Sequence, residues 1–369
     1  MLSIGKGLSI QAHPNKKLAE QLHAARPDVY KDGNHKPEMA IAVTDFEAMC
    51  NFRPAEQVVR FIAAVPELAR LMGSAGVDLL AAAVSASASP DQDEAVKAAL
   101  REAFSKWATA DSAQVATEVA ALIARLETEG CETKDDADLT FANVLAQRLD
   151  HQFPGGDVGV FSPYLLNCLK LKPGEALFLA ADEPHAYLSG DIFECMACSD
   201  NVVRMGCTPK LRDTDTLCSM LTYQTGPARV LGGTADATVP AESGSVRLYQ
   251  PLDDAVDEFQ VERIEVIAGQ TVTTPVLDAP SILVCCTAPD GVGQGTIAAI
   301  QEGAGQVGQA GQAERDVGAG KAVEMTGGTV FMQEAGTSLT IEAGSGGGNL
   351  VVFRACSRQP LGGGESKSA

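Results

Sequence analysis

The feature that most constrains the fold is a long stretch with helical periodicity inside an otherwise strand-like chain. Its segments AEQVVRFIAAVPELARLMG (55–73) and DEAVKAALREAFSKWATADSAQVATEVAALIARLETEG (93–130) carry apolar residues three to four positions apart, the spacing of one helix face. Segments on either side, such as MAIAV (39–43) and SILVCC (281–286), are short apolar runs typical of strands. Strands before and after a helical block predict a mainly β protein with an α-helical insertion.

This change of pattern divides the chain into five expected parts. Residues 1–53 supply the first part of a β domain, residues 54–152 form a helical insertion domain, and residues 153–220 complete the β domain. Residues 221–360 are expected to form a second β domain, and the small polar tail at 361–369 is expected to be disordered.

A weak internal similarity relates the two β domains. The segments FLAADEPH (178–185) and FMQEAGTS (331–338) both precede a further strand, and His185 then falls opposite Ser338. This favours two related β-barrels, of which one carries a ligand-binding residue at this place and the other does not.

Composition excludes several classes of partner. The 369 residues carry a net charge of −20 with no run of Lys and Arg, whereas nucleic acids and anionic membranes bind clustered positive charge. The sequence has no apolar run long enough for a transmembrane helix and no signal-peptide pattern at its start. Its ten cysteines are scattered, as is typical of free thiols in a reducing compartment. We therefore expect a cytoplasmic protein without a nucleic-acid or membrane partner.

The stretch LSIQAHPNK (8–16) places two polar side chains on one face of a strand. Side chains alternate along a strand, so Gln11 and His13 point one way while Ile10 and Ala12 point the other way. One interpretation is a strand end that runs onto the surface. The other is a pair of metal ligands whose partners come from elsewhere in the chain.

The stretch YKDGNHKPEM (30–39) combines a turn with a carboxylate that opens an apolar strand. Glu38 follows a proline and precedes MAIAV, and a buried carboxylate needs a partner because an unpaired buried charge is costly. A salt bridge to Lys36 or Arg53 would satisfy it. The alternative is that Glu38 joins Gln11 and His13 around a metal.

A further ligand is expected to be a histidine on another strand. Of the five histidines, His185 in DEPHAYLSGD is the best placed, because it opens a strand after a proline turn. His23 and His151 lie in helical segments. A Gln-His-Glu-His set with an open position suits a catalytic zinc ion.

Three charged residues follow close behind His185. Arg204 and Lys210 lie in DNVVRMGCTPK, and both side chains suit phosphate, although surface salt bridges explain them equally well. Glu194 lies on the strand that begins at His185 and is either a catalytic base or a paired core carboxylate.

Two of these stretches carry a resemblance to a known family. YKDGNHKPE (30–38) is similar to the Y-x-D-x-N-H-K-P-E signature of type I mannose-6-phosphate isomerases, and HAYLSGDIFECMACSDNVVRMGCTPK (185–210) resembles their second signature. LSIQAHPNK, NFRP (51–54) and VVFRAC (351–356) resemble the family too. The resemblance extends over nearly the whole chain.

The resemblance implies a fold and a metal site. The fold is a pair of cupin-type β-barrels with an inserted helical domain, the second barrel having no metal. The implied ligands of one Zn²⁺ per chain are Gln11, His13, Glu38 and His185. Arg204 falls where the family has its catalytic arginine.

The implied reaction is the interconversion of mannose 6-phosphate and fructose 6-phosphate through a cis-enediol, which feeds mannose and GDP-mannose metabolism. The expected partner is a small sugar phosphate, and the expected state is a monomer. Lys36, Lys210 and Ser9 are expected to contact the substrate or its phosphate. Glu194 and a zinc-bound water are the options for the base. The alternative is an inactive truncated fragment or a non-catalytic cupin-like protein that binds a sugar phosphate.

The chain departs from the family at two places. Met205 stands where the family usually has alanine, and its side chain is expected either to crowd Arg204 or to point into the core. Family members also carry a β region ahead of the LSIQAHPNK strand, whereas Met1 stands just before it. The first barrel is therefore expected to lack several strands.

Overall fold

The structure of the chain is a computed structural model. It describes residues 1–86, 92–286, 294–299, 305–309, 315–317 and 322–358. The expected disordered tail at 361–369 lies outside the described residues.

The first barrel is built from strands that lie on both sides of the helical stretch in the sequence. Its strands are β1 (Leu2–Ile4), β2 (Ile10–Ala12), β3 (Glu38–Ala42), β4 (Phe46–Phe52), β5 (Leu166–Leu171), β6 (Ala176–Leu179), β7 (His185–Met196) and β8 (Val203–Gly206). They pair in the order β5-β4-β7-β2-β8, with β1 and β3 also on β7, and β6 on β3. The long strand β7 is thus the element that joins all parts of this barrel.

Strand β7 bends at Gly190, and the bend curls the sheet. The residues before Gly190 pair with β4 and those after it pair with β3. Gly190 has φ +102°, and a Cβ there would lie 2.4 Å from the carbonyl oxygen of Asp45. A glycine is therefore required at this position, and the bend lets the two ends of β7 face a common interior.

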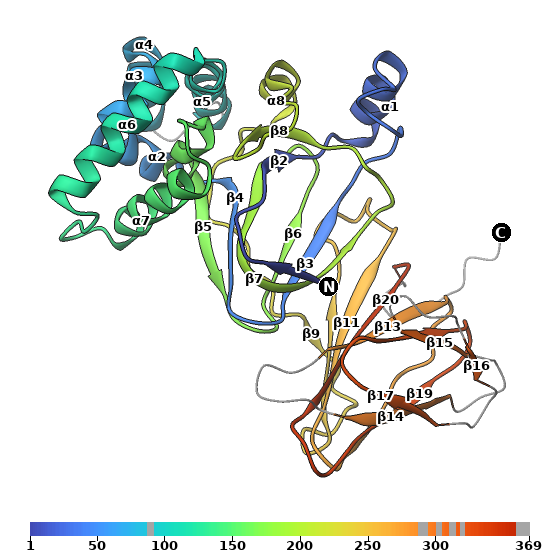
Figure 1. The fold of residues 1–369 in the computed structure, drawn as a ribbon. Helices are drawn as coiled ribbons and strands as arrows, with labels where there is room; N and C mark the ends of the chain where they lie inside the picture. Colours follow the sequence, from blue (N-terminus) through green and yellow to red (C-terminus); the bar gives the residue numbers. More distant parts are fainter. Residues whose placement is uncertain (87–91, 287–293, 300–304, 310–314, 318–321, 359–369) are drawn as a thin grey trace.

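Helices cover one face of this sheet (Figure 1). They are α1 (Lys16–Ala25), α2 (Ala55–Ala64), α3 (Pro66–Met72), α4 (Ser74–Ser85), α5 (Gln92–Ala108), α6 (Ser112–Glu129), α7 (Ala137–Gln152), the 3₁₀ helix η1 (Val158–Tyr164) and α8 (Thr214–Met220). Ile10 and Ala12 of β2 are fully buried in the same apolar cluster as Trp107 of α5. One face of β2 thus packs toward the helices, which leaves its other face for the barrel interior.

The second barrel packs two sheets face to face. Its strands are β9 (Thr234–Ala235), β10 (Gly244–Tyr249), β11 (Gln260–Val266), β12 (Thr271–Thr273), β13 (Ser281–Cys286), β14 (Gly295–Ala299), β15 (Gly305–Gln309), β16 (Arg315–Val317), β17 (Val323–Met325), β18 (Thr329–Gln333), β19 (Leu339–Ala343) and β20 (Leu350–Cys356). One sheet has the order β16-β15-β18-β13-β20-β11-β10-β9 and the other β12-β19-β14-β17. Alternate apolar residues such as Ile264, Leu283 and Ile341 fill the space between them.

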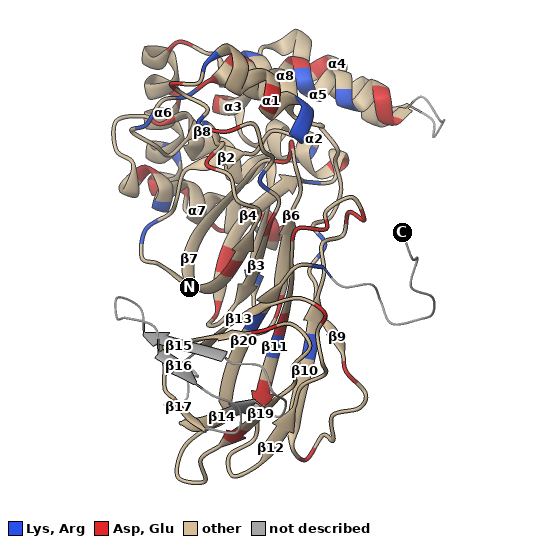
Figure 2. Ribbon diagram, turned by 90° about the vertical axis from the view of Figure 1, so that its right-hand side faces the viewer, with Lys and Arg blue, Asp and Glu red and all other residues tan. Residues whose placement is uncertain are grey.

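The two barrels meet along a shared apolar cluster. Met39 and Ile41 of β3 and Phe193 of β7 pack against Val261 and Phe353 of the second barrel. The rings of Phe193 and Phe353 stack with centroids 4.6 Å apart. Figure 2 shows the result as an elongated molecule, with the helices at one end, the first barrel in the middle and the second barrel at the other end.

The structure confirms the expectation of a mainly β protein with a helical insertion. Helices α2 to α7 all lie between residues 55 and 152. The two similar segments also occupy similar places, because His185 opens β7 after β6 while Ser338 directly precedes β19 after β18. Among the described residues, no single helix has the length and hydropathy of a membrane span, although α3 and α4, bent by 102°, pass that test as a pair.

Candidate metal centre

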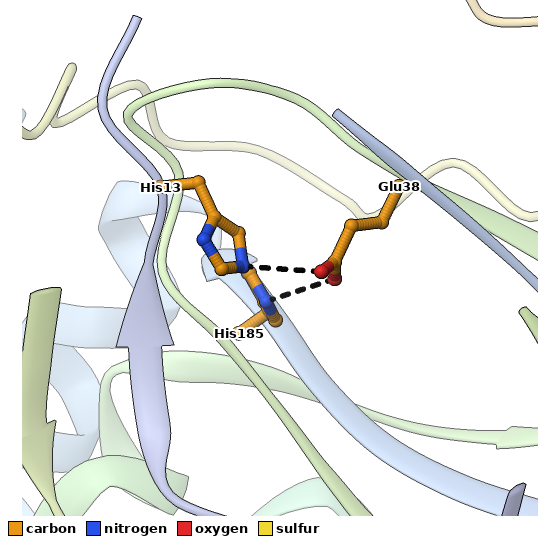
Figure 3. Close-up of side chains that lie close together, drawn as sticks. All are labelled: His13, Glu38 and His185. Atoms are coloured by element: carbon orange, nitrogen blue, oxygen red, sulfur yellow. Dashed lines mark ion pairs between the residues drawn. The ribbon is translucent and has the colours of Figure 1, made fainter. Parts of the chain in front are cut away.

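Three buried side chains converge inside the first barrel (Figure 3). Their exposed fractions are 0% for His13 and 1% each for Glu38 and His185. The Nε2 atom of His13 lies 3.3 Å from Oε1 of Glu38, and the Nε2 atom of His185 lies 3.5 Å from Oε2 of the same carboxylate. Their ligand atoms all lie within 4.8 Å of one another, a separation that one metal ion can bridge.

Each of the three residues stands next to a proline at a strand end. His13 follows β2 and precedes Pro14, whereas Glu38 and His185 open β3 and β7 directly after a proline. Proline has a fixed φ and lacks an N–H donor, so it ends or begins a strand at a defined residue. The three side chains are therefore presented at points where a strand begins or ends.

Both imidazoles are held by their Nδ1 atoms. Nδ1 of His13 lies 2.7 Å from the carbonyl oxygen of Asn201, and Nδ1 of His185 lies 3.2 Å from that of Glu183. A carbonyl oxygen only accepts, so each Nδ1 carries a proton and Nε2 is the nitrogen that remains for a ligand. Neither buried Nε2 atom makes a hydrogen bond within the described residues. This is the arrangement of metal-binding histidines, whose second nitrogen donates to a carbonyl or carboxylate.

The electrostatics of the centre keep both ligand types in the form that binds a metal. Burial lowers the pKa of His13 below its ordinary value of 6.5, although Glu38 opposes this effect. Burial alone would raise the pKa of Glu38, but the imidazoles of His13 and His185 outweigh it and hold that pKa well below 4.5. At neutral pH the centre therefore offers a neutral imidazole from His13 and a carboxylate from Glu38.

Gln11 and Arg204 share the face of the sheet that carries His185. In the strand register Gln11 of β2 is the partner of His185 on β7 and of Arg204 on β8. Directly opposed residues of antiparallel strands project to the same face. The guanidinium of Arg204 makes no hydrogen bond or ion pair with the described residues, and burial lowers its pKa.

A second group of polar side chains surrounds Glu38. Nζ of Lys36 lies 3.1 Å from Oε1 of Glu38. The Tyr187 hydroxyl donates to Glu194 at 2.9 Å and lies 3.4 Å from Glu38. Burial, followed by the charge of Glu38, raises the pKa of Glu194 above 4.5. Glu194 is thus connected to the centre through one tyrosine.

The remaining expected site residues are placed less centrally. Lys210 is exposed on the segment after β8, and Ser9 is half-buried just ahead of β2. The alternative pairing of Glu38 with Arg53 is wrong, because Nε of Arg53 donates to the carbonyl of Pro163 at 3.0 Å. Met205 is buried among the helix-facing residues and points away from the face of Arg204.

The sequence interpretation missed Tyr187 and the carbonyl of Asn201. Tyr187 lies two residues after His185 on the same strand, so strand alternation alone would have placed both on one face. Nothing local in the sequence indicates the contact between Asn201 and His13, which are 188 positions apart.

Comparison with protein families gives two matches. Residues 1–55 match the model of the phosphomannose isomerase type I catalytic domain. Residues 71–166 match the model of the phosphomannose isomerase type I helical insertion domain.

Curated relatives match over most of the chain. Mannose-6-phosphate isomerase of Bos taurus is 43% identical over 300 residues, which cover 81% of this chain and 66% of the bovine protein. Mannose-6-phosphate isomerase 2 of Arabidopsis thaliana is 42% identical over 282 residues, which cover 76% of this chain and 60% of that protein. The chain thus spans just under two thirds of the length of these relatives.

Solved structures share the fold. A phosphomannose isomerase variant from Salmonella typhimurium has a TM-score of 0.68 and 25% identity, with coverage of 97% of this chain and 78% of that one. A mannose 6-phosphate isomerase bound with zinc and yttrium has a TM-score of 0.67, 25% identity and the same coverage. The expected architecture of two cupin-type barrels with a helical insertion is therefore confirmed.

Proposed function

The chain belongs to the type I phosphomannose isomerase family, and on this premise we propose that it interconverts mannose 6-phosphate and fructose 6-phosphate. The observation that carries the proposal is the buried group of His13, Glu38 and His185. In it two imidazole nitrogens face a carboxylate and make no hydrogen bond within the described residues. Burying such atoms is costly unless a ligand completes them, and a metal ion does so.

We propose that one zinc ion per chain is held by these three residues together with Gln11. Gln11 is included because its register places it beside His185 on the same face. When bound, the ion supplies a Lewis acid that polarises the oxygens of the substrate.

The reaction moves a proton between C1 and C2 of the sugar through a cis-enediol, and we propose Glu194 as the base. The Tyr187 hydroxyl orients its carboxyl group at 2.9 Å. The raised pKa of Glu194 makes it a stronger base than an ordinary carboxylate.

Arg204 is proposed to stabilise the negative charge that develops on the substrate oxygen. Its guanidinium shares a face with Gln11 and makes no hydrogen bond or ion pair with the described residues. A donor without a competing acceptor is free to meet a developing oxyanion. Lys36, Lys210 and Ser9 remain proposed contacts for the sugar or its phosphate. Lys36 lies closest to the centre of the three, because its Nζ atom is 3.1 Å from Oε1 of Glu38.

Other features of the proposal follow from the family and the composition. We propose a monomer in the cytoplasm that supplies mannose and GDP-mannose metabolism. Every cysteine is a free thiol, which fits a reducing compartment. A non-catalytic sugar-phosphate-binding protein or an inactive fragment is not favoured, because His13, Glu38 and His185 form a group that could hold a metal and Arg204 shares a sheet face with Gln11.

The test is a coupled assay of the purified chain with mannose 6-phosphate, before and after loading with Zn²⁺. We expect activity in the loaded wild type, bound zinc close to one per chain, and loss of both in His185→Ala. His151→Ala is the matched control, because His151 is exposed in the last turn of α7. Undiminished zinc in His185→Ala would remove His185 from the ligand set, and a loaded wild type that binds the substrate without converting it would favour the binding protein.

A further inference from the structure

The two histidines of the metal centre are held in different ways. His185 donates from Nδ1 to Glu183, two residues earlier on its own segment. His13 donates instead to Asn201, which belongs to the turn between β7 and β8. The orientation of His13 therefore depends on the position of a distant turn, whereas that of His185 is set by its own strand.

The turn that contains Asn201 is hydrogen-bonded to the turn that precedes β3. Asn201 is 1% exposed, and its Nδ2 atom donates to the carbonyl oxygens of Asp32 at 2.7 Å and Asn34 at 2.9 Å. The same Nδ2 atom also lies 3.2 Å from Oδ1 of Asp32. These contacts leave the backbone carbonyl of Asn201 free to face His13.

The carboxylate of Asp32 accepts hydrogen bonds from both turns. Its Oδ1 accepts from the Asn34 N–H at 2.9 Å and from the Ser199 hydroxyl at 2.9 Å. Its Oδ2 accepts from the Asp200 N–H at 2.8 Å. We call Asp32, Asn34, Ser199, Asp200 and Asn201 the Asp32 cluster. Burial opposes the charge on Asp32, but these donors outweigh it and lower its pKa below 3.8.

We propose that Asp32 is a positioning residue for the metal centre, which it serves by holding the Asn201 carbonyl against Nδ1 of His13. The contact keeps a proton on Nδ1, so that Nε2 is the nitrogen that would bind a metal. The inference rests on the metal site of the proposed function. It assigns to Asp32 no contact with the metal or the substrate.

Asp32→Asn is the sharpest variant because it keeps the size of the side chain. A carboxylate offers acceptors only, and Asp32 uses both oxygens to receive donors from Asn34, Ser199 and Asp200. An amide turns one of these acceptors into a donor that faces another donor. Asn201→Ala tests the same chain of contacts from its other end, because it removes the anchoring amide and keeps the backbone carbonyl.

The experiment measures the affinity of the metal-free chain for Zn²⁺ by competition with a chelating dye. We expect both variants to lose about 10–100-fold in affinity, the usual cost of removing a residue that orients a metal ligand. Asp28→Asn is the control, because Asp28 is an exposed carboxylate upstream of the same turn. It should bind Zn²⁺ as the wild type does.

A second readout separates orientation from general destabilisation. In protein labelled with ¹⁵N-histidine, the His13 resonance of the metal-free wild type should show the Nδ1-protonated tautomer, and Asp32→Asn should show a mixture. Ser199→Ala, which removes a single donor, serves as a milder variant if Asp32→Asn does not fold.

The possible outcomes separate this inference from the proposed function. Unchanged zinc affinity in the variants, or weakened affinity with an unchanged His13 tautomer, would overturn the role of Asp32. Failure of the wild type to bind Zn²⁺ would instead overturn the metal site, while the tautomer would still report whether Asp32 orients His13.

Discussion

Each barrel buries a cluster of charged side chains, but the two clusters differ in the groups that face the carboxylate. In the first barrel, Glu38 faces two imidazoles whose Nε2 atoms make no hydrogen bond within the described residues. In the second barrel, Glu262 on β11 faces Arg354 on β20, which is fully buried and donates from Nε to the carboxylate at 2.7 Å. A second nitrogen of Arg354 also pairs with Glu262.

The second cluster is completed by neutral side chains. Nη1 of Arg354 donates to the Thr274 hydroxyl at 3.0 Å and lies 3.3 Å from the amide oxygen of Gln333. Gln333 in turn donates to the carbonyl of Thr337 at 2.7 Å and accepts from the Ser281 hydroxyl at 3.0 Å. The second barrel thus pairs its buried carboxylate with an arginine, whereas Glu38 of the first barrel contacts Lys36 and also faces two imidazoles. An imidazole nitrogen can bind a metal whereas a guanidinium has only donors, which is why the first barrel is expected to bind a metal and the second is not.

The largest expected effect comes from removing the internal cation of the second barrel. Arg354→Met should reduce the free energy of unfolding by about 3–5 kcal/mol, because it leaves the Glu262 charge buried and unpaired. Urea unfolding with and without Zn²⁺ measures the loss, which should be the same in both conditions. The double variant Arg354→Met, Glu262→Leu should recover much of it, and a single variant as stable as the wild type would contradict the comparison.

The next effect concerns the free guanidinium of the first barrel. Arg204→Ala should lower turnover by about 10²–10³-fold while zinc content and stability stay close to wild type, because Arg204 is proposed to act on the transition state. Lys210→Ala is the matched comparison and should mainly raise KM, as expected for a residue that binds substrate and transition state alike. A rise in KM alone in Arg204→Ala would make Arg204 a binding residue.

Zinc itself should stabilise only through the first barrel. At a free Zn²⁺ concentration 100-fold above Kd, binding adds about 2.7 kcal/mol to the free energy of unfolding. Thermal unfolding with Zn²⁺ and with a chelator should show this gain in the wild type and in Arg204→Ala, but not in His185→Ala. An equal gain in His185→Ala would place the stabilising ion elsewhere.

The smallest effect is expected from Glu265, a half-buried carboxylate on β11 of the second barrel. Burial raises the pKa of Glu265, but the Asn349 amide at 2.9 Å and Arg263 at 2.8 Å outweigh it and lower that pKa below 4.5. A lowered carboxyl pKa stabilises the fold above the pKa of the unfolded chain, and this contribution disappears as the pH falls through the folded pKa. Glu265→Gln should therefore cost at most about 1 kcal/mol at pH 7, as for other partly exposed pairs. The cost should shrink on acidification below pH 4.5, and a cost that grows instead would contradict this account.

Much of the centre could be predicted from short stretches of sequence. Alternation along LSIQAHPNK placed Gln11 and His13 opposite Ile10 and Ala12, and the structure buries the latter two toward the helices. The proline before His185 marked the start of its strand correctly. Glu38 contacts Lys36, one of its two expected salt-bridge partners, and also lies close to the two histidines.

The sequence by itself determined which residues share a strand face, where the helices interrupt the β domains, and which polar residues open a strand. These properties depend on backbone geometry and on neighbours a few positions apart. Only the tertiary structure decided that Tyr187 connects Glu194 to Glu38, that Asn201 holds His13 from 188 positions away, and that Arg354 completes the second cluster. Such contacts depend on strand register and on the bend of β7 at Gly190, which the packing of the whole chain sets and no short stretch encodes.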